Sequence, residues 1–340
     1  DQDFGVLTLN GVETLNLSTA TRCKDFDVTD ADGTDDGVDI SYIGYALDLD
    51  MDALEVLNIT GNVSIDLSGM YLENVTAINA DTFTGGLQVS LGSLNTNDVT
   101  ITTGDSGDAY NDIRGGSGND TITITSDADN DAAGGALGND TITITGDGDN
   151  WITGGYGGND VITVIGDGDN DIQGGDAEDD GLGGYLNNDD VFMVTGNGDN
   201  SIEAGNYGND TITITGDGDN YIQAGDLDDT ITITGNGDNT IYAGKDDDTI
   251  VITGSGANWI SGGDGLDTMT GGSGVDTYDF CAVTNSQGVT VDVITNFQGG
   301  VGGDILDFAS VGLVGVAAYV GEAVGYGAVL TSLTAGLSNA

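Results

Sequence analysis

The stretch that decides the fold lies in the middle of the chain, where one pattern recurs as GGSGNDTITITSDADNDAA (Gly115–Ala133), GGALGNDTITITGDGDNWIT (Gly134–Thr153) and GGYGGNDVITVIGDGDNDIQ (Gly154–Gln173). Further copies begin at Ala204, Ala224 and Ala243. A period of 19 or 20 residues indicates a repeat architecture. In such proteins one copy cannot bury its apolar face alone and must stack on its neighbours.

Each copy has two halves, and each half predicts one strand. In TITIT, Ile122 and Ile124 face one side of the strand while the threonines face the other. Glycine-rich turns, where a positive φ costs least, separate the strands. The second, shorter strand is centred on Ile152, Ile172, Ile202, Ile222, Ile241 and Ile260. The pattern predicts an all-β fold, a right-handed parallel β-solenoid whose rungs stack and bury their rows of isoleucine.

One acid holds the same place in every copy. Its successive spacings are 20, 20, 30, 20, 19, 19 and 19 residues, and the single 30 marks an insertion that begins at Ala177. The acids are Asp120, Asp140, Asp160, Asp190, Asp210, Asp229, Asp248 and Asp267. Upstream, NDVTITT (Asn97–Thr103) continues the pattern and makes Asp98 the predicted first member of the column.

The chain divides into three predicted parts: an irregular β-solenoid over residues 1–96, the repeats over 97–280, and a C-terminal cap with an apolar tail over 281–340. Segments from Val12, Leu54 and Asn74 alternate like strands but lack the glycine turns, so we expect them to continue the same coil. The acidic stretch Lys24–Gly37 is interpreted as a surface loop or a separate cation site.

The charge and composition of the chain exclude several classes of function. The 340 residues include 58 acids, four bases and no histidine, for a formal net charge of −54. Nucleic-acid binding is not expected, because phosphate contacts need clustered Lys and Arg. Neither docking on an anionic membrane nor membrane insertion is expected. No catalytic motif such as G-x-S-x-G or H-E-x-x-H appears, and we expect no enzyme.

A stacked column of carboxylates needs a counterion. Rungs of a parallel sheet repeat about every 4.8 Å. Two unit charges at that distance repel by about 0.9 kcal/mol in water and by about 3.5 kcal/mol at an effective dielectric of 20. Summed over the column, this repulsion is comparable with the stability of a domain. Because the turns offer only oxygen ligands and flexible carbonyls, the cation expected between them is Ca²⁺.

The turn motifs also resemble a known family. GGSGNDTIT, GGDGLDTMT and GGSGVDTYD resemble the GGxGxDxUx nonapeptide of the RTX calcium-binding β-roll proteins, over roughly Asn97 to Phe280. The resemblance implies several Ca²⁺ ions, held by the sixth-position aspartates and by glycine carbonyls. On this chain those aspartates are the column acids together with Asp276. It also implies folding outside the cell after type I secretion.

The opposite turn departs from that motif, because asparagine replaces the aspartate. The asparagines are Asn130, Asn150, Asn170, Asn200, Asn220, Asn239 and Asn258. Stacked amides predict a hydrogen-bonded ladder there, with Asp276 stacked over Asn258. Paired acids on this edge are either further Ca²⁺ ligands or a solvated acidic edge: Asp147, Asp149, Asp167, Asp169, Asp217, Asp219 and Asp238. Lys245 replaces a turn residue and is expected to weaken one site.

The C-terminal part resembles the segment that closes RTX repeats. That resemblance implies a capping ion at Asp292, Asn296, Asp304 and Asp307. The apolar tail beyond Phe308 is a secretion signal, a cap or a subunit contact. Cys23 and Cys281 are too few for a disulfide framework. They either pair between successive subunits or remain two isolated thiols.

The segments VETLNLS and NVTAINADTFTGGLQVSL are similar to the solenoid of RTX-containing bacterial surface-layer proteins. The function expected is therefore a secreted, calcium-binding structural protein that assembles with itself into a surface layer or extracellular filament. The alternatives are an RTX adhesin module that binds sugar or ice, or a non-catalytic module of a larger secreted enzyme. Trp151, Tyr221 and Trp259 recur at equivalent positions and form either a stacking patch for a cell-surface polysaccharide or a subunit contact.

Overall fold

Strands and turns form all of the chain that the computed structural model describes, which is residues 7–8, 13–19, 49–50, 53–175, 188–280, 292–307 and 328–329. Within these ranges there is no helix. The described residues accordingly include no helical segment with the length and hydropathy of a membrane span. The all-β prediction is confirmed.

The chain divides into two units, Asp1–Glu178 and Asp179–Ala340. The strands of unit 1 are β1 (Leu7–Thr8), β2 (Thr14–Thr19), β3 (Leu49–Asp50), β4 (Val56–Gly61), β5 (Ile65–Asp66), β6 (Ala77–Ala80), β7 (Leu87–Ser90), β8 (Thr100–Thr103), β9 (Asn111–Arg114), β10 (Thr121–Thr125), β11 (Asn130–Gly135), β12 (Thr141–Thr145), β13 (Trp151–Gly155), β14 (Val161–Ile165) and β15 (Asp171–Gln173). In unit 1 the even-numbered strands follow one another from β2 to β14 in one sheet, and the odd-numbered strands from β5 to β15 in another.

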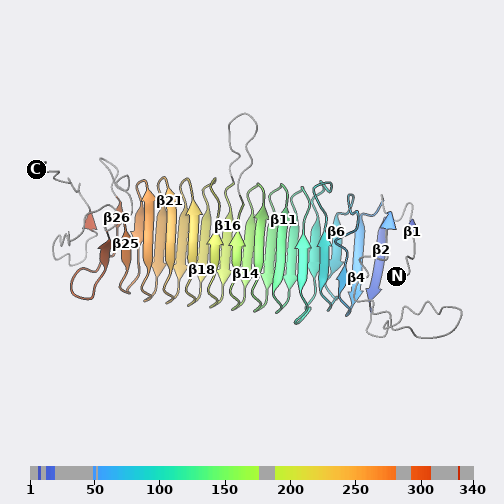
Figure 1. The fold of residues 1–340 in the computed structure, drawn as a ribbon, viewed down its shortest axis with the longest axis horizontal. Helices are drawn as coiled ribbons and strands as arrows, with labels where there is room; N and C mark the ends of the chain where they lie inside the picture. The colour runs from blue at the N-terminus through green and yellow to red at the C-terminus, as the bar shows by residue number, and fades with distance from the viewer. Residues whose placement is uncertain are drawn as a thin grey trace, which may run out of the picture. The chain divides into compact units, whose positions relative to one another are not determined.

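Unit 2 repeats this organisation. Its strands are β16 (Val191–Thr195), β17 (Ser201–Glu203), β18 (Thr211–Thr215), β19 (Tyr221–Gly225), β20 (Thr230–Thr234), β21 (Thr240–Lys245), β22 (Thr249–Thr253), β23 (Trp259–Asp264), β24 (Thr268–Thr270), β25 (Thr277–Asp279), β26 (Val293–Ile294), β27 (Ile305–Asp307) and β28 (Ala328–Val329). Even-numbered strands again form one sheet and odd-numbered strands the other, and β28 joins β26 in antiparallel orientation. Figure 1 shows the strands side by side within each unit.

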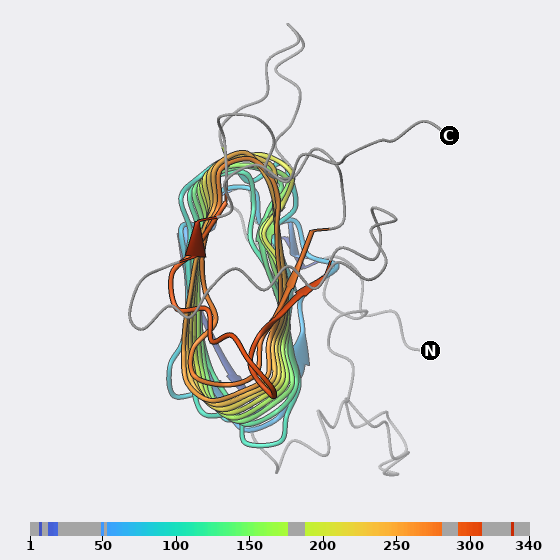
Figure 2. The same cartoon turned by 90° about the vertical axis from the view of Figure 1, so that its left-hand side faces the viewer.

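Parallel pairing between every second strand makes each unit a β-solenoid, as predicted. In unit 1 Ile122 pairs with Ile142, and Ile142 pairs with Ile162. Figure 2 looks along the coil, where successive turns within a unit form a flattened ring with one sheet on each long side. Apart from Ile165 on β14 and Ile305 on β27, which are exposed, the isoleucines of the strands point into that ring and are buried. Each buried isoleucine contributes about 1.5–3 kcal/mol, so the stacked rows form the core.

The irregular N-terminal segment joins the regular repeats without a break in unit 1. β4 pairs with β6, β6 with β8, and β8 with β10, all in parallel. On the outer face, Asn58 donates to Asn16 at 2.8 Å and Asn79 donates to Asn58 at 2.9 Å. The predicted continuity of the coil is therefore confirmed over the described residues from β4 onward.

Several expectations fall outside the described residues. They concern Cys23, Cys281, the acidic stretch Lys24–Gly37, the insertion that begins at Ala177, and the tail beyond Phe308 except Ala328–Val329. The disulfide, loop and tail hypotheses therefore remain predictions.

Candidate metal centre

The predicted column of aspartates exists and is buried. Each member lies at the end of a glycine-rich turn, directly before a strand of the even-numbered sheet, and is at most 2% exposed. We call these residues the Asp column: Asp120, Asp140 and Asp160 in unit 1, and Asp190, Asp210, Asp229, Asp248 and Asp267 in unit 2.

One oxygen of each carboxylate is used by the backbone of the adjacent rung. The amide of Asp120 donates to Oδ1 of Asp140 at 2.7 Å, and the amide of Asp229 donates to Oδ1 of Asp248 at 2.8 Å. The same bond recurs along both units: Asp140 to Asp160, Asp190 to Asp210, Asp210 to Asp229, Asp248 to Asp267, and Asp267 to Asp292. Asp292 therefore extends the Asp column of unit 2.

The second oxygen lacks a hydrogen-bond donor along much of unit 2. Oδ2 of Asp210, Asp229, Asp248 and Asp267 is buried with no hydrogen-bond partner. A buried anionic oxygen without a donor or cation is strongly unfavourable. Something other than the protein's own N–H groups must therefore compensate these oxygens, and a proton, a bound water or a cation can do so.

The pKa values of the column aspartates also show that their charged form is unfavourable in the buried column. Burial raises the pKa of Asp140 and Asp229 to about 8 and that of Asp248 to about 9, with the neighbouring carboxylates adding to the increase and the backbone hydrogen bond opposing it. Burial likewise raises the pKa of Asp160, Asp210 and Asp267 to about 7. A neighbouring dication would favour the charged form and reverse these increases.

The opposite turns carry the predicted ladder of asparagines, which we call the Asn column. In each rung Nδ2 donates both to Oδ1 of the next asparagine and to the carbonyl two residues back; for Asn220 these acceptors are Asn239 and Gly218, each at 2.9 Å. The bonds join Asn130, Asn150 and Asn170 in unit 1 and Asn200, Asn220, Asn239 and Asn258 in unit 2. The amide thus supplies the donors that the carboxylate lacks.

Two further residues belong to this column. Asn111 donates to Oδ1 of Asn130 at 2.8 Å and begins the column in unit 1. The sequence does contain a signal for Asn111, because DAYND (Asp108–Asp112) resembles DADND (Asp127–Asp131) and lies 19 residues before it. At the other end Asn258 donates to Oδ1 of Asp276 at 2.8 Å, which confirms that Asp276 stacks over Asn258. Asp276 in turn donates its amide to Asp304.

The prediction that Asp98 begins the Asp column is wrong. Thr100 pairs with Thr121, so Val99 occupies the position equivalent to Asp120. Val99 indeed donates its amide to Oδ1 of Asp120. Asp98 is exposed and accepts a hydrogen bond from the amide of Asn119 at 2.8 Å. It belongs to an outer column that also includes Asn139 and Asn159.

The paired acids beside the Asn column are all exposed: Asp147, Asp149, Asp167, Asp169, Asp217, Asp219 and Asp238. Their backbone amides donate to side chains of the preceding rung, as Asp167 does to Asp147 at 3.0 Å and Asp238 to Asp219 at 2.6 Å. The described residues contain no group of three or more acids, cysteines or histidines placed to hold a metal.

Of the four predicted capping residues, two extend the columns and two have other partners. Asp292 continues the Asp column and Asp304 continues the Asn column. Asn296 accepts from the amide of Gly271 at 3.1 Å, and Asp307 pairs with Asp279 in the strand register of β25 and β27.

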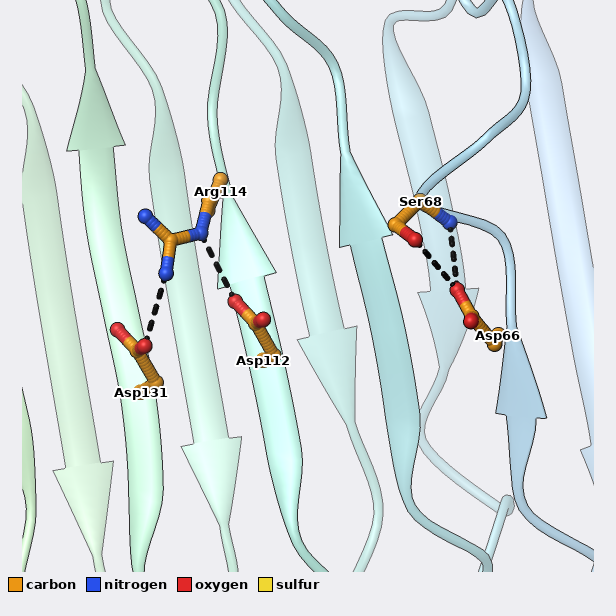
Figure 3. Close-up of polar contacts among 5 residues, drawn as sticks. All are labelled: Asp66, Ser68, Asp112, Arg114 and Asp131. Atoms are coloured by element: carbon orange, nitrogen blue, oxygen red, sulfur yellow. Dashed lines mark hydrogen bonds and ion pairs between the residues drawn. The ribbon is translucent and has the colours of Figure 1, made fainter. Parts of the chain in front are cut away.

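Two of the four basic residues neutralise surface acids. Figure 3 shows Arg114 on β9 between Asp112 on the same strand and Asp131 on β11, at 3.0 and 2.8 Å. The same view shows Oδ1 of Asp66 accepting bonds from the backbone and hydroxyl of Ser68. In unit 2 Lys245 pairs with Asp226 at 2.5 Å on the exposed face of the turn.

Exposed aromatic side chains lie on the outer face of the odd-numbered sheet. In unit 2 Tyr221 and Trp259 occupy the same register position two strands apart, with Thr240 between them. Tyr242 contacts Tyr221 with ring centroids 5.9 Å apart. Trp151 is similarly exposed on β13 of unit 1.

Comparison with known proteins adds no relative to these observations. No protein-family model matches the chain, and neither curated proteins nor solved structures yield a significant match.

Proposed function

We propose that this chain is a secreted structural protein whose turns bind Ca²⁺ and which assembles with copies of itself into a surface layer or extracellular filament. The observation that carries the proposal lies in unit 2, where Oδ2 of Asp210, Asp229, Asp248 and Asp267 is buried in successive rungs without a hydrogen-bond donor. The likeness of the turn sequences to the RTX nonapeptide supports the same reading.

The donor set suits Ca²⁺ among the common cations. Carboxylate and carbonyl oxygens are its preferred ligands, and it accepts irregular coordination from flexible turns. Thiolate and imidazole ligands, which favour zinc and copper, are missing from the described turns. When bound, the ion would supply positive charge to the carboxylates of the Asp column, which are oriented by the bonds that their Oδ1 atoms accept from backbone N–H groups.

Net charge links folding to assembly. At −54, two copies of the chain repel each other strongly unless cations screen or bridge them. A solenoid built from many equivalent rungs is suited to a structural role, because its stability is the sum of many similar contacts between neighbours. Calcium that folds the coil would therefore also allow copies to approach.

The test is calcium titration of the full chain after treatment with a chelator. We expect a low urea-unfolding midpoint by circular dichroism without Ca²⁺, a cooperative rise of that midpoint on adding it, and ordered assemblies in electron microscopy afterwards. Magnesium at equal concentration and ionic strength is the control. An unfolding midpoint that is the same in excess chelator and in Ca²⁺, with no uptake of Ca²⁺, would contradict the proposal.

One observation favours a second candidate, binding of an uncharged polysaccharide. Tyr221, Tyr242 and Trp259 are exposed side chains on one sheet surface of unit 2, and aromatic rings stack on the apolar faces of sugars. Adding soluble neutral glycans should quench tryptophan fluorescence, and the variant Trp259→Ala should lose most of the response. Tyr156→Ala, which removes an exposed aromatic side chain from a turn, is the control. Unchanged fluorescence with every glycan would exclude this candidate.

A further inference from the structure

The two tryptophans of the chain, Trp151 and Trp259, occupy equivalent positions but have different surroundings. Each is the first residue of its strand, β13 or β23, and directly follows an asparagine of the Asn column. Both indoles lie on the outer face of the coil, where Trp151 is 44% exposed and Trp259 is 36% exposed. The side chains around each ring therefore decide what that ring can bind.

Carboxylates flank Trp151 on three sides. Its partners in the parallel register are Asp131 on β11 and Asp171 on β15. Rungs of such a sheet lie about 4.8 Å apart. Asp149, two residues before Trp151, is exposed on the same outer face. The indole thus lies between two acidic positions and beside a third.

One base lies in this region and does not cancel its charge. Arg114 bonds Asp112 at 3.0 Å and Oδ2 of Asp131 at 2.8 Å, so two carboxylates share one guanidinium (Figure 3). Oδ1 of Asp131 has no hydrogen-bond donor. Four carboxylates and one guanidinium leave a net charge of −3 around the ring, the acids being Asp112, Asp131, Asp149 and Asp171.

The phenol of Tyr110, directly before β9, responds to the same charges. Burial raises the pKa of Tyr110, Asp112 and Asp131 raise it further, and Arg114 lowers it by less than either aspartate raises it. The electrostatic field at this part of the outer face is therefore negative even with the arginine in place.

Trp259 is the neutral counterpart within the same chain. Its register partners are Thr240 on β21 and Thr277 on β25. The residue two before it is Ala257, where Trp151 has Asp149. None of these three positions around Trp259 carries a charge. The chain therefore presents the same ring twice, once among carboxylates and once among uncharged side chains.

An indole among carboxylates suits a large, weakly hydrated cation. The face of tryptophan attracts cations, and quaternary ammonium groups are the ligands that aromatic side chains recognise in this way. Their methyl groups pack on the ring and carry no N–H that requires an acceptor. Carboxylates one rung away add Coulomb attraction. Ca²⁺, by contrast, takes oxygen ligands rather than a ring face.

We infer that Trp151, with Asp131 and Asp171 on either side, binds a quaternary ammonium ligand on the outer face of unit 1. The site is separate from the buried Asp column and from the neutral aromatic surface of unit 2. It therefore goes beyond the proposed function and does not depend on it.

Choline is the probe that tests the inference. The variant Trp259→Phe leaves Trp151 as the only tryptophan of the full chain. At fixed Ca²⁺ and constant ionic strength, choline should change the fluorescence of this variant saturably, and saturation-transfer NMR should reach the choline methyl protons. The uncharged analogue, in which a tert-butyl group replaces the trimethylammonium head, should have neither effect.

Adding Asp171→Asn should weaken choline binding about two- to fourfold, because it removes one flanking charge and keeps the ring. Asp217→Asn, an exposed acid of unit 2, is the matched control and should leave the affinity unchanged. The variant Trp151→Phe, which leaves Trp259 as the reporter, should show no change in tryptophan fluorescence. Adding Thr240→Asp with Thr277→Asp to it should create a response, and this converse variant keeps the test decisive if Asp171→Asn fails to fold by circular dichroism.

Three results would overturn the site. They are no saturable response to choline, an equal response to its uncharged analogue, and an affinity that Asp171→Asn leaves unchanged. A response of Trp259 equal to that of Trp151 would show that the carboxylates do not select the cation. None of these outcomes bears on calcium binding by the Asp column, which is measured separately.

Discussion

Replacing Asn220 with aspartate is expected to destabilise unit 2 by about 3 kcal/mol or more in the absence of calcium. Asn220 is 2% exposed, and its Nδ2 donates to Gly218 and to Asn239. The substitution removes both donors and places a buried negative charge against two acceptor oxygens. Urea unfolding followed by circular dichroism in chelator measures the loss.

The control for this change is Asn209→Asp, which adds the same charge at an exposed position of unit 2. Surface substitutions of this kind usually alter stability by no more than about 0.5 kcal/mol. The reverse substitution, Asp229→Asn, should stabilise the calcium-free protein, because it replaces a carboxylate whose Oδ2 lacks a donor with an amide. If Asn220→Asp costs no more than Asn209→Asp, the Asn column does not stabilise the coil as described.

The calcium-free protein is expected to lose stability as the pH rises. The pKa of Asp229 is about 8 and that of Asp248 about 9 in the folded chain, both raised from 3.8 by burial. The folded state therefore binds more protons than the unfolded state between these limits. Its stability is fully present below the unfolded pKa and falls as the pH rises through the folded pKa values.

Unfolding midpoints in chelator, measured at intervals from about pH 5 to about pH 9, should decline throughout, with the steepest loss below about pH 7 and a levelling off as the pH passes the folded pKa values. Asp229→Asn combined with Asp248→Asn should flatten the upper part of this curve. The exposed Asp217→Asn is the comparison variant, since it removes the same charge from the surface. Two results would refute a role for the buried carboxylates: a midpoint that rises with pH, or a curve of midpoint against pH that Asp217→Asn flattens as much as the double variant does.

Much of the fold follows from periodicity alone. The alternation in TITIT places isoleucine inside and threonine outside, and the fixed spacing of Asn150, Asn170 and their equivalents predicts a ladder because parallel rungs keep register. The prediction for Asp98 fails for a local reason. One extra residue, Val99, separates that acid from its strand, and a shift of one residue reverses the side a side chain faces.

The details of the candidate site depend on distances between atoms on either side of a turn, and the spacing of residues along the sequence does not give these distances. Nothing in the sequence indicates that the point where a Cβ of Gly134 would stand lies beside the carboxylate of Asp140, six residues later. Likewise, the sequence does not reveal that Oδ1 of Asp229 and Asp248 accepts a backbone N–H while their Oδ2 has no donor. Both features come from the way the turn closes on the preceding strand.

The Asn column has a consequence for how such a gene can change. Every internal asparagine accepts a hydrogen bond from the asparagine of the rung before it and donates one to the asparagine of the rung after it, as Asn220 does between Asn200 and Asn239. If one whole turn were removed or duplicated, each donor would still face an acceptor. A chain of this design can therefore gain or lose one whole turn while the hydrogen bonds of the Asn column remain complete.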